Sequence, residues 1–269
     1  MNWIFLSKYG TDRYINAFAM GSGAEPTVLE QWRYEDSANP LVIRGITKHK
    51  IIHQCWQDGR PFRYMDSGYF GNQIGSTNLN GWKFWHRVVS NDLQHGAVQK
   101  RPADRWKRLR IGLKKRHHGS KIMLIPPDEK PCVFYGIDLA DWIDATITEI
   151  QRHTDREIIF RERQPSRRAR VANAVEHALA DVHAVVTYNS IAATEAVIAG
   201  VPAFTLAPAN AASPVAGQDL ATIDQPWWPT DDERYAWACH LAYGQFHVEE
   251  LANGTAARIL KETEDRKHA

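Results

Sequence analysis

Two polar residues, Asn189 and Ser190, interrupt an otherwise apolar part of the chain, and their side-chain oxygens are of the kind that cap helices. The residues before them, 183–187, are apolar and β-branched, which predicts a buried strand. Residues 191–199 are rich in alanine and have apolar residues at helical spacing, which predicts a helix. Because the N–H groups at the start of a helix attract anions, this strand, turn and helix predict a phosphate site.

Asp66 is the second residue whose position predicts chemistry. It ends a short predicted strand, which begins at Phe62, and begins the turn Asp66-Ser67-Gly68. The carboxyl ends of strands line the crevice in open α/β sheets, so we expect Asp66 to face a cleft as a general base. Asp-Ser-Gly is also a common turn, in which the aspartate only caps the backbone. The sequence leaves both interpretations open.

A basic segment, residues 99–121, contains one acidic residue, Asp104, among many lysines and arginines. Basic charge with an interleaved aromatic residue is what contact with a phosphate backbone and stacking on bases require. A charged linker between two domains is the alternative, since Pro102 and Gly112 interrupt any long helix. The candidate nucleic-acid-binding residues are Lys100, Arg101, Arg105, Trp106, Lys107, Arg108, Arg110, Lys114, Lys115 and Arg116.

The elements that must position these residues alternate between strand and helix. Gly200 suits a left-handed helix stop, Pro202 prevents continuation, and residues 203–206 begin another strand. Residues 121–125 predict a buried strand, and residues 138–153 have the apolar stripe of an amphipathic helix. This alternation is typical of an α/β fold with parallel strands.

The Asn-Ser turn, the small-residue helix with Thr194, Glu195 and Ala196, and the Gly-Val-Pro stop at 200–202 together resemble the C-terminal domain of GT-B glycosyltransferases. The similarity is greatest to enzymes that make capsule and lipopolysaccharide and to phage enzymes that glycosylate modified DNA bases. The resemblance implies two Rossmann-like α/β domains facing a cleft, with a C-terminal helix returning to the N-terminal domain. Other strand–helix–strand units can carry a capped helix and a Gly-x-Pro stop, so the fold needs confirmation.

The resemblance also implies domain limits. Residues 1–115 are expected to form an N-terminal, acceptor-side domain that includes the basic segment. Residues 116–245 are expected to form the nucleotide-sugar-binding domain, and residues 246–269 the returning helix and a tail.

In such families the polar turn and helix start hold the donor diphosphate, a glutamate binds the donor ribose, and a basic strand end faces the phosphates. Arginine suits this last role because its planar fork donates two parallel hydrogen bonds. An aspartate of the N-terminal domain acts as base in the phage enzymes, which matches Asp66. The donor-binding candidates carried over by position are Arg161, Arg163, Asn189, Ser190, Thr194, Glu195, Ser213 and Gly217.

We expect no metal and no cofactor, because the sequence has no Asp-x-Asp pair at a strand end and no glycine-rich dinucleotide or Walker loop. The expected donor is a nucleotide sugar, linked through UDP. The three cysteines are scattered without a disulfide or zinc pattern, which indicates a reducing cytoplasm, that of the host if the protein is phage-encoded. No apolar run reaches about 18 residues, so we expect no membrane span.

The sequence thus predicts a metal-independent glycosyltransferase whose acceptor is a hydroxymethylated pyrimidine in double-stranded phage DNA. A surface polysaccharide is the alternative acceptor, and only the basic segment distinguishes the two. A sugar-nucleotide epimerase on the same fold and a non-enzymatic nucleic-acid-binding protein are alternatives of other classes. Neither the sugar nor the stereochemical course can be deduced from the sequence.

Overall fold

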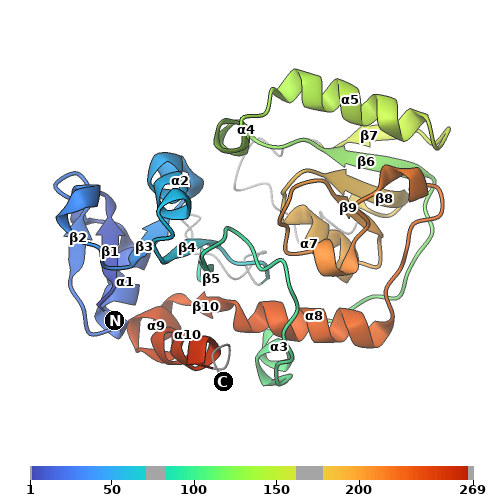
Figure 1. Cartoon of the computed structure of the whole chain (residues 1–269). Coiled ribbons are helices and arrows are strands. Elements are labelled where there is room, and N and C mark those ends of the chain that lie inside the picture. Colours follow the sequence, from blue (N-terminus) through green and yellow to red (C-terminus); the bar gives the residue numbers. More distant parts are fainter. Residues whose placement is uncertain (1, 71–82, 162–177, 266–269) are drawn as a thin grey trace. The chain divides into compact units, whose positions relative to one another are not determined.

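The computed structural model describes residues 2–70, 83–161 and 178–265 of the 269-residue chain (Figure 1). These residues form two compact units. Within the described ranges, unit 1 contains residues up to 70, 83–93 and 243–265, and unit 2 contains residues 94–161 and 178–242. Each unit has its own sheet and its own hydrophobic core.

Unit 1 contains, among its described residues, a six-stranded sheet in the order β10-β5-β4-β3-β1-β2. The strands β1 to β4 are parallel to one another, β5 is antiparallel to β4, and β10 is antiparallel to β5. The parallel part therefore has one edge where the carboxyl ends of the strands gather. The strands are β1 (Ile4–Ser7), β2 (Pro26–Val28), β3 (Leu41–Arg44), β4 (Phe62–Ser67), β5 (Trp85–Ser90) and β10 (Gln245–His247).

The helices of unit 1 are α1 (Arg13–Gly21), α2 (His49–Gln57), α9 (Val248–Ala252) and α10 (Thr255–Asp265). The carboxylate of Asp12 caps α1 by accepting hydrogen bonds from the N–H groups of Tyr14 and Ile15. The last helices return to this unit, because Leu251 and Ile259 share one apolar core with residues of α1 and of the sheet. The expected return of the C-terminal helix to the N-terminal domain is thus confirmed.

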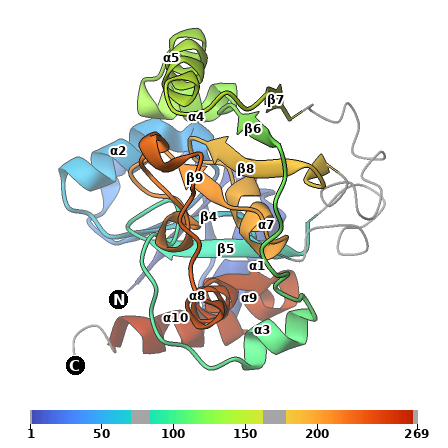
Figure 2. The ribbon, with the colours of Figure 1, turned by 90° about the vertical axis from the view of Figure 1, so that its right-hand side faces the viewer.

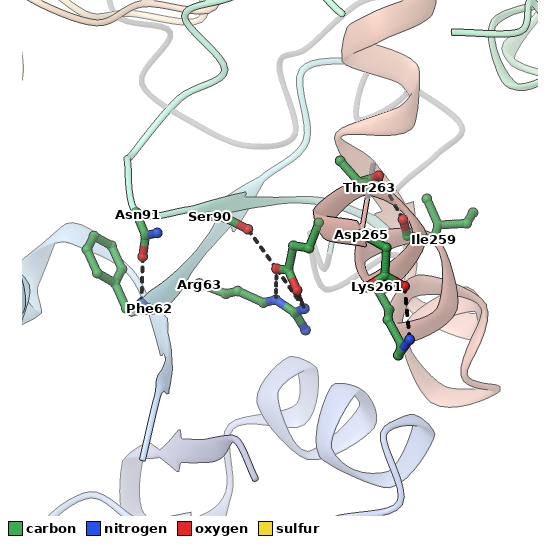
Figure 3. Close-up of polar contacts among 9 residues, drawn as sticks. Phe62, Arg63, Ser90, Asn91, Ile259, Lys261, Thr263 and Asp265 are labelled. Carbon is green, nitrogen blue, oxygen red and sulfur yellow. Dashed lines mark hydrogen bonds and ion pairs between the residues drawn. The ribbon is translucent and has the colours of Figure 1, made fainter. Parts of the chain in front are cut away.

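An ion pair fastens α10 to the sheet of unit 1. Arg63 on β4 donates from Nη2 to both carboxylate oxygens of Glu264 at 2.9 Å, and Ser90 on β5 donates to the same carboxylate at 3.3 Å. Figure 3 shows Arg63 and Ser90 extending from the two strands toward the helix. The guanidinium also lies over the ring of Trp3 at 4.0 Å, and only 4% of Arg63 is exposed. A nearly buried guanidinium therefore depends on this carboxylate for its charge compensation.

Unit 2 has a four-stranded parallel sheet in the order β7-β6-β8-β9, counted over its described residues. Its central strand β8 is buried along its whole length, as its apolar sequence predicts. Helices α5 and α7 lie on opposite faces of this sheet (Figures 1 and 2). The elements are β6 (Lys121–Ile125), β7 (Ile158–Phe160), β8 (Val182–Thr187), β9 (Ala203–Thr205), α3 (Asp104–Leu109), α4 (Glu129–Tyr135), α5 (Leu139–Gln151), α7 (Ala192–Ile198) and α8 (Asp231–Tyr243).

Residues 94–115 belong to unit 2, whereas the sequence assigned them to the N-terminal domain. Hydrogen bonds within unit 2 explain the difference. The Arg105 Nε donates to the carbonyl oxygen of Ala242 at 2.9 Å, and the Lys114 N–H donates to that of Ile198 at 2.8 Å. Gly200 has a left-handed φ of +87°, and a Cβ there would come within 2.1 Å of the Lys115 carbonyl oxygen. The basic segment is thus built into the second unit.

Within the part of the chain that the structure describes, no helix has both the length and the apolar character required to cross a bilayer.

Candidate functional site

The carboxyl edge of the sheet in unit 2 brings together residues that lie far apart in the sequence. The strands β6, β7 and β8 are parallel, with Leu124 opposite Phe160 and Ile125 opposite Thr187. Arg161, which follows β7, and the turn 188–190, which follows β8, therefore lie at the same edge. The backbone N–H of Arg161 donates to the Leu124 carbonyl oxygen at 3.2 Å, which holds the start of this segment against β6.

Arg161 and Glu195, both predicted from the sequence, form an ion pair at this edge. The Nη1 and Nη2 atoms of Arg161 each donate to one oxygen of Glu195, Oε2, at 3.3 Å. The two side chains are 35% and 21% exposed. The contacts are long for charge-assisted hydrogen bonds, and both groups are accessible to solvent. A guanidinium and a carboxylate placed in this way can bind a phosphate and a hydroxyl group, respectively.

The turn between β8 and α7 is held from two sides by buried amide side chains. Gln94 donates to the Asn189 carbonyl oxygen at 2.7 Å and accepts from the Ala211 N–H at 2.9 Å. Asn210, which is fully buried, donates to the Ser190 carbonyl oxygen at 3.4 Å. Gln94 and Asn210 could not be identified from the sequence, because neither residue lies in a motif and only the tertiary contacts reveal their role.

The first N–H groups of α7 already have partners inside the turn. The Ala192 N–H donates to Ser190 Oγ at 3.2 Å, and the Ala193 N–H donates to the Ser190 carbonyl oxygen at 3.3 Å. The Thr194 N–H donates to the Ile191 carbonyl oxygen at 3.0 Å. Helix α7 has only the seven residues 192–198, so few peptide dipoles are aligned and its N-terminus attracts an anion only weakly. The expected anion attraction at this edge therefore comes mainly from Arg161.

Three of the donor-binding candidates make hydrogen bonds within unit 2. Thr194 is fully buried, and its hydroxyl donates to the backbone of its own helix. Ser213 Oγ lies 3.0 Å from the hydroxyl of Thr205 on β9. Gly217 forms backbone hydrogen bonds with β9 through both its N–H and its carbonyl oxygen. These groups have partners within the protein, and donor binding by Thr194, Ser213 and Gly217 stays a prediction; Arg163 lies outside the described residues.

An aromatic cluster adjoins the same turn. Tyr188 meets the rings of Tyr135 and Trp142 edge to face, with centroids 5.2 and 6.2 Å apart. Burial raises the pKa of Tyr188, so its hydroxyl stays protonated at neutral pH. Because Tyr188 directly follows β8, the cluster lies at the same carboxyl edge of the sheet. Only Trp142 had a role predicted from the sequence, on the apolar stripe of the helix at 138–153.

The candidate nucleic-acid-binding residues of the basic segment differ in how far they are exposed. Arg105 and Trp106 are only 7% and 4% exposed, so a guanidinium and an indole that were expected to touch nucleic acid pack inside unit 2. Their assignment to nucleic-acid binding is thus corrected. Arg101 and Arg116 are half-buried. The exposed members are Lys100, Lys107, Arg108, Arg110, Lys114 and Lys115.

Asp66 lies at the carboxyl edge of the sheet in unit 1, near the end of β4. Its Oδ2 accepts a hydrogen bond from the Tyr64 hydroxyl at 2.7 Å and lies 3.6 Å from Arg87 Nη2, and its Oδ1 accepts from the Ser67 N–H at 2.7 Å. Burial alone would raise the pKa of Asp66, but the Arg87 guanidinium and these two hydrogen bonds lower it to about 2. The side chain is 35% exposed. Asp66 is therefore an ionised carboxylate that remains open to solvent.

Across residues 2–70, 83–161 and 178–265, no three His, Cys, Asp or Glu side chains are grouped so that they could hold a metal ion. Metal-independent chemistry remains a prediction, as does the choice of UDP.

The mixed sheet of unit 1, the parallel sheet of unit 2 with its strand–helix–strand unit β8-α7-β9, and the returning C-terminal helix together define a GT-B-like α/β fold, as the sequence predicted. No family model matches the chain, and no curated protein matches its sequence. The solved structure "Thermosulfurimonas dismutans KpsC, beta Kdo 2,7 transferase" is similar, with a TM-score of 0.52, 11% identity and coverage of 95% of this chain and 98% of that one. The beta Kdo 2,4 transferase of the same KpsC has a TM-score of 0.49 at 13% identity, over 88% of this chain and 90% of that one. Similarity at this level of identity concerns the fold.

Proposed function

We propose that this protein is a glycosyltransferase that moves a sugar from a nucleotide-sugar donor to a hydroxyl group. The observation that carries the proposal is the pair formed by Arg161 and Glu195 at the carboxyl edge of the sheet in unit 2. In this proposal Arg161 binds the diphosphate and Glu195 accepts hydrogen bonds from the ribose hydroxyls. The similarity of the fold to a structure named a Kdo transferase supports transfer of a sugar.

The chemistry requires that the leaving diphosphate be neutralised while the acceptor hydroxyl loses its proton. The planar fork of Arg161 is suited to the first task, with the Ser190 hydroxyl beside it. Asp66 takes the second task, because it is ionised and partly exposed. Its low pKa makes it a weak base in the free protein. An acceptor hydroxyl that displaced the Tyr64 hydroxyl from Oδ2 would remove one of the contacts that lower this pKa.

The aromatic cluster of Tyr135, Trp142 and Tyr188 supports a nucleobase site beside the charged pair, since bases pack well on aromatic side chains. UDP is the nucleotide that we propose. A reducing compartment such as the cytoplasm is also part of the proposal, because all three cysteines are buried free thiols.

For the acceptor we favour a saccharide over DNA, because the aromatic residue of the basic segment, Trp106, is buried and cannot stack on a base. Hydroxymethylated pyrimidine in DNA is the second candidate, and the exposed cations at Lys107, Arg108 and Arg110 favour it. A gel shift with duplex DNA at moderate salt separates the two acceptors: the absence of any shift removes the DNA candidate.

Calorimetric titration with UDP, CDP and their sugar conjugates tests the donor site. Arg161→Ala should weaken binding by about 1.5–3 kcal/mol, because it removes a charge-assisted contact. Glu195→Gln should weaken it by about 1–3 kcal/mol. The matched control is Arg156→Ala, since Arg156 precedes β7 and pairs with Asp224 at 3.0 Å, whereas Arg161 follows the same strand.

Equal affinity in Arg161→Ala, Arg156→Ala and the unaltered protein would contradict the proposed donor site. Incubation with the nucleotide sugar alone distinguishes an epimerase, which would convert the donor without any acceptor. A non-enzymatic nucleic-acid-binding protein would gain no thermal stability from nucleoside diphosphates.

A further inference from the structure

A group of cationic side chains lies at the carboxyl edge of the sheet in unit 1. Arg44, the last residue of β3, donates from Nη1 to the carboxylate of Asp12 at 3.1 Å. The ammonium group of Lys48 donates to the Arg44 carbonyl oxygen, and that of Lys83 donates to Ser67 Oγ at 2.7 Å. Three positive groups therefore lie near the ends of two adjacent parallel strands, β3 and β4.

Among the described residues, Lys48 lacks the carboxylate partner that Arg44 has in Asp12. Its ammonium group donates to the Arg44 carbonyl oxygen, a neutral acceptor. Burial lowers the pKa of Lys48, and the neighbouring charges of Arg44 and Lys8 lower it further, while Asp12 and Asp66 act in the opposite direction. A partly buried ammonium group in such a position is stabilised when an anion binds beside it.

A second observation comes from two buried nitrogen atoms around Tyr14. The Arg44 guanidinium lies 4.6 Å from the centre of the Tyr14 ring, and the His86 ring lies 3.8 Å from it. Arg44 Nε and His86 Nδ1 are both buried and have no hydrogen-bond partner in the part of the chain that the structure describes. His86 is only 1% exposed. Since buried polar atoms in proteins are nearly always hydrogen-bonded, both atoms are unsatisfied polar groups beside the cations of this edge.

Tyr9 makes the same edge suitable for a sugar ring. It follows β1, the neighbour of β3, and its side chain is 67% exposed. Its backbone has a left-handed φ of +51°, which is strained for an aromatic residue, and its N–H is held by the carboxylate of Glu30 at 2.7 Å. The Lys8 ammonium lies 5.2 Å from the centre of the Tyr9 ring, so an exposed aromatic ring and a further cation lie together just after β1.

We propose that this edge of unit 1 binds the acceptor through a carboxylate group carried by an acceptor sugar, and this inference rests on the proposed glycosyltransferase function. The carboxylate accepts hydrogen bonds from Arg44 and Lys48, and a hydroxyl of the same sugar then lies toward Asp66 on the adjacent strand. A monoanion suits the site better than a phosphate dianion, because Asp12 already compensates part of the charge of Arg44. The acceptor class is thus an acidic saccharide.

The test is an NMR titration of the full-length protein with methyl glucuronide and methyl glucoside, which differ only in the carboxylate. The glucuronide should bind at least about tenfold more tightly, as expected for a charge-assisted contact. Lys48→Gln should remove this preference, and Lys48→Arg should retain most of it. Lys50→Gln is the matched control, because Lys50 is an exposed lysine of the adjoining helix α2 and should leave binding unchanged.

Equal binding of the two methyl glycosides by the unaltered protein would overturn the inference, even if Lys48→Gln failed to fold. Tighter binding of inorganic phosphate or of a DNA duplex than of the glucuronide would also overturn it. Titration of UDP on the same samples separates this inference from the proposed function. Nucleotide binding without a preference for the acid would refute the acceptor class alone, whereas loss of nucleotide binding would refute the donor site.

Discussion

Replacing Asp66 with asparagine distinguishes a general base from a residue that only caps a turn. The amide keeps the shape of the side chain, and its oxygen can still accept the Ser67 N–H. The change removes the negative charge that faces Arg87 at 3.6 Å and one acceptor for the Tyr64 hydroxyl. If Asp66 takes a proton from the acceptor, turnover should fall by about 10² to 10⁴, the usual contribution of a general base.

The effect on stability can be worked out from the lowered pKa. The decrease from 3.8 to about 2 corresponds to at most about 2.5 kcal/mol of stabilisation by the ionised form. The carboxylate is 35% exposed, so solvent screening reduces the expected value to about 1 kcal/mol. Because the pKa is lowered in the folded state, this stabilisation is present above about pH 4 and is lost as the pH falls toward 2.

The assay combines steady-state kinetics, nucleotide titration and urea unfolding at pH 7 and pH 3. We expect Asp66→Asn to lower kcat, to leave the affinity for UDP unchanged, and to lose about 1 kcal/mol of stability at pH 7 and less at pH 3. Asp224→Asn is the control, since it removes a carboxylate from an ion pair with Arg156 in unit 2. Unchanged turnover in Asp66→Asn would show that Asp66 is only a cap and would refute the assigned role.

Two further predictions concern packing. Glu264→Gln should lower the stability of unit 1 by about 1–3 kcal/mol in urea unfolding, because it leaves the Arg63 guanidinium, 4% exposed, without a carboxylate. Glu262→Gln, which breaks an exposed pair on the same helix, should change stability by less than about 0.5 kcal/mol, and equal effects would contradict the argument. Gly217→Ala should destabilise unit 2 by about 1–3 kcal/mol, because the added Cβ would lie 2.5 Å from a buried phenylalanine ring. Gly112→Ala, where a Cβ meets nothing within 4 Å, is its control, and comparable unfolding midpoints for the two variants would refute the clash.

The local structure around the turn 188–190 could be predicted from the sequence alone. The strand and helix expected at 183–187 and 191–199 are found at Val182–Thr187 and Ala192–Ile198. Gly200 has the left-handed backbone expected of a helix stop. These features follow from signals that lie within a few residues of one another, such as β-branched runs, small helix-forming residues and backbone breakers. The same local signals identified the fold class.

Burial and partnership depend on the tertiary structure. Thr194 and Glu195 are adjacent in the sequence, yet one is fully buried and the other pairs with Arg161 at the solvent-accessible edge. Arg105 and Trp106 lie in a basic segment whose composition predicts exposed side chains, but packing within unit 2 buries both. Gln94 and Asn210 hold the site turn without belonging to any motif.

The sequence by itself determined which segments form strands and helices and which side chains stand near strand ends, because backbone preferences act over a few residues. Only the tertiary structure decided which of those side chains meet. Arg161 reaches Glu195, and Asp66 faces Arg87, because strand pairing brings together segments that are distant along the chain. Side-chain exposure likewise depends on which face of each element the rest of the unit covers.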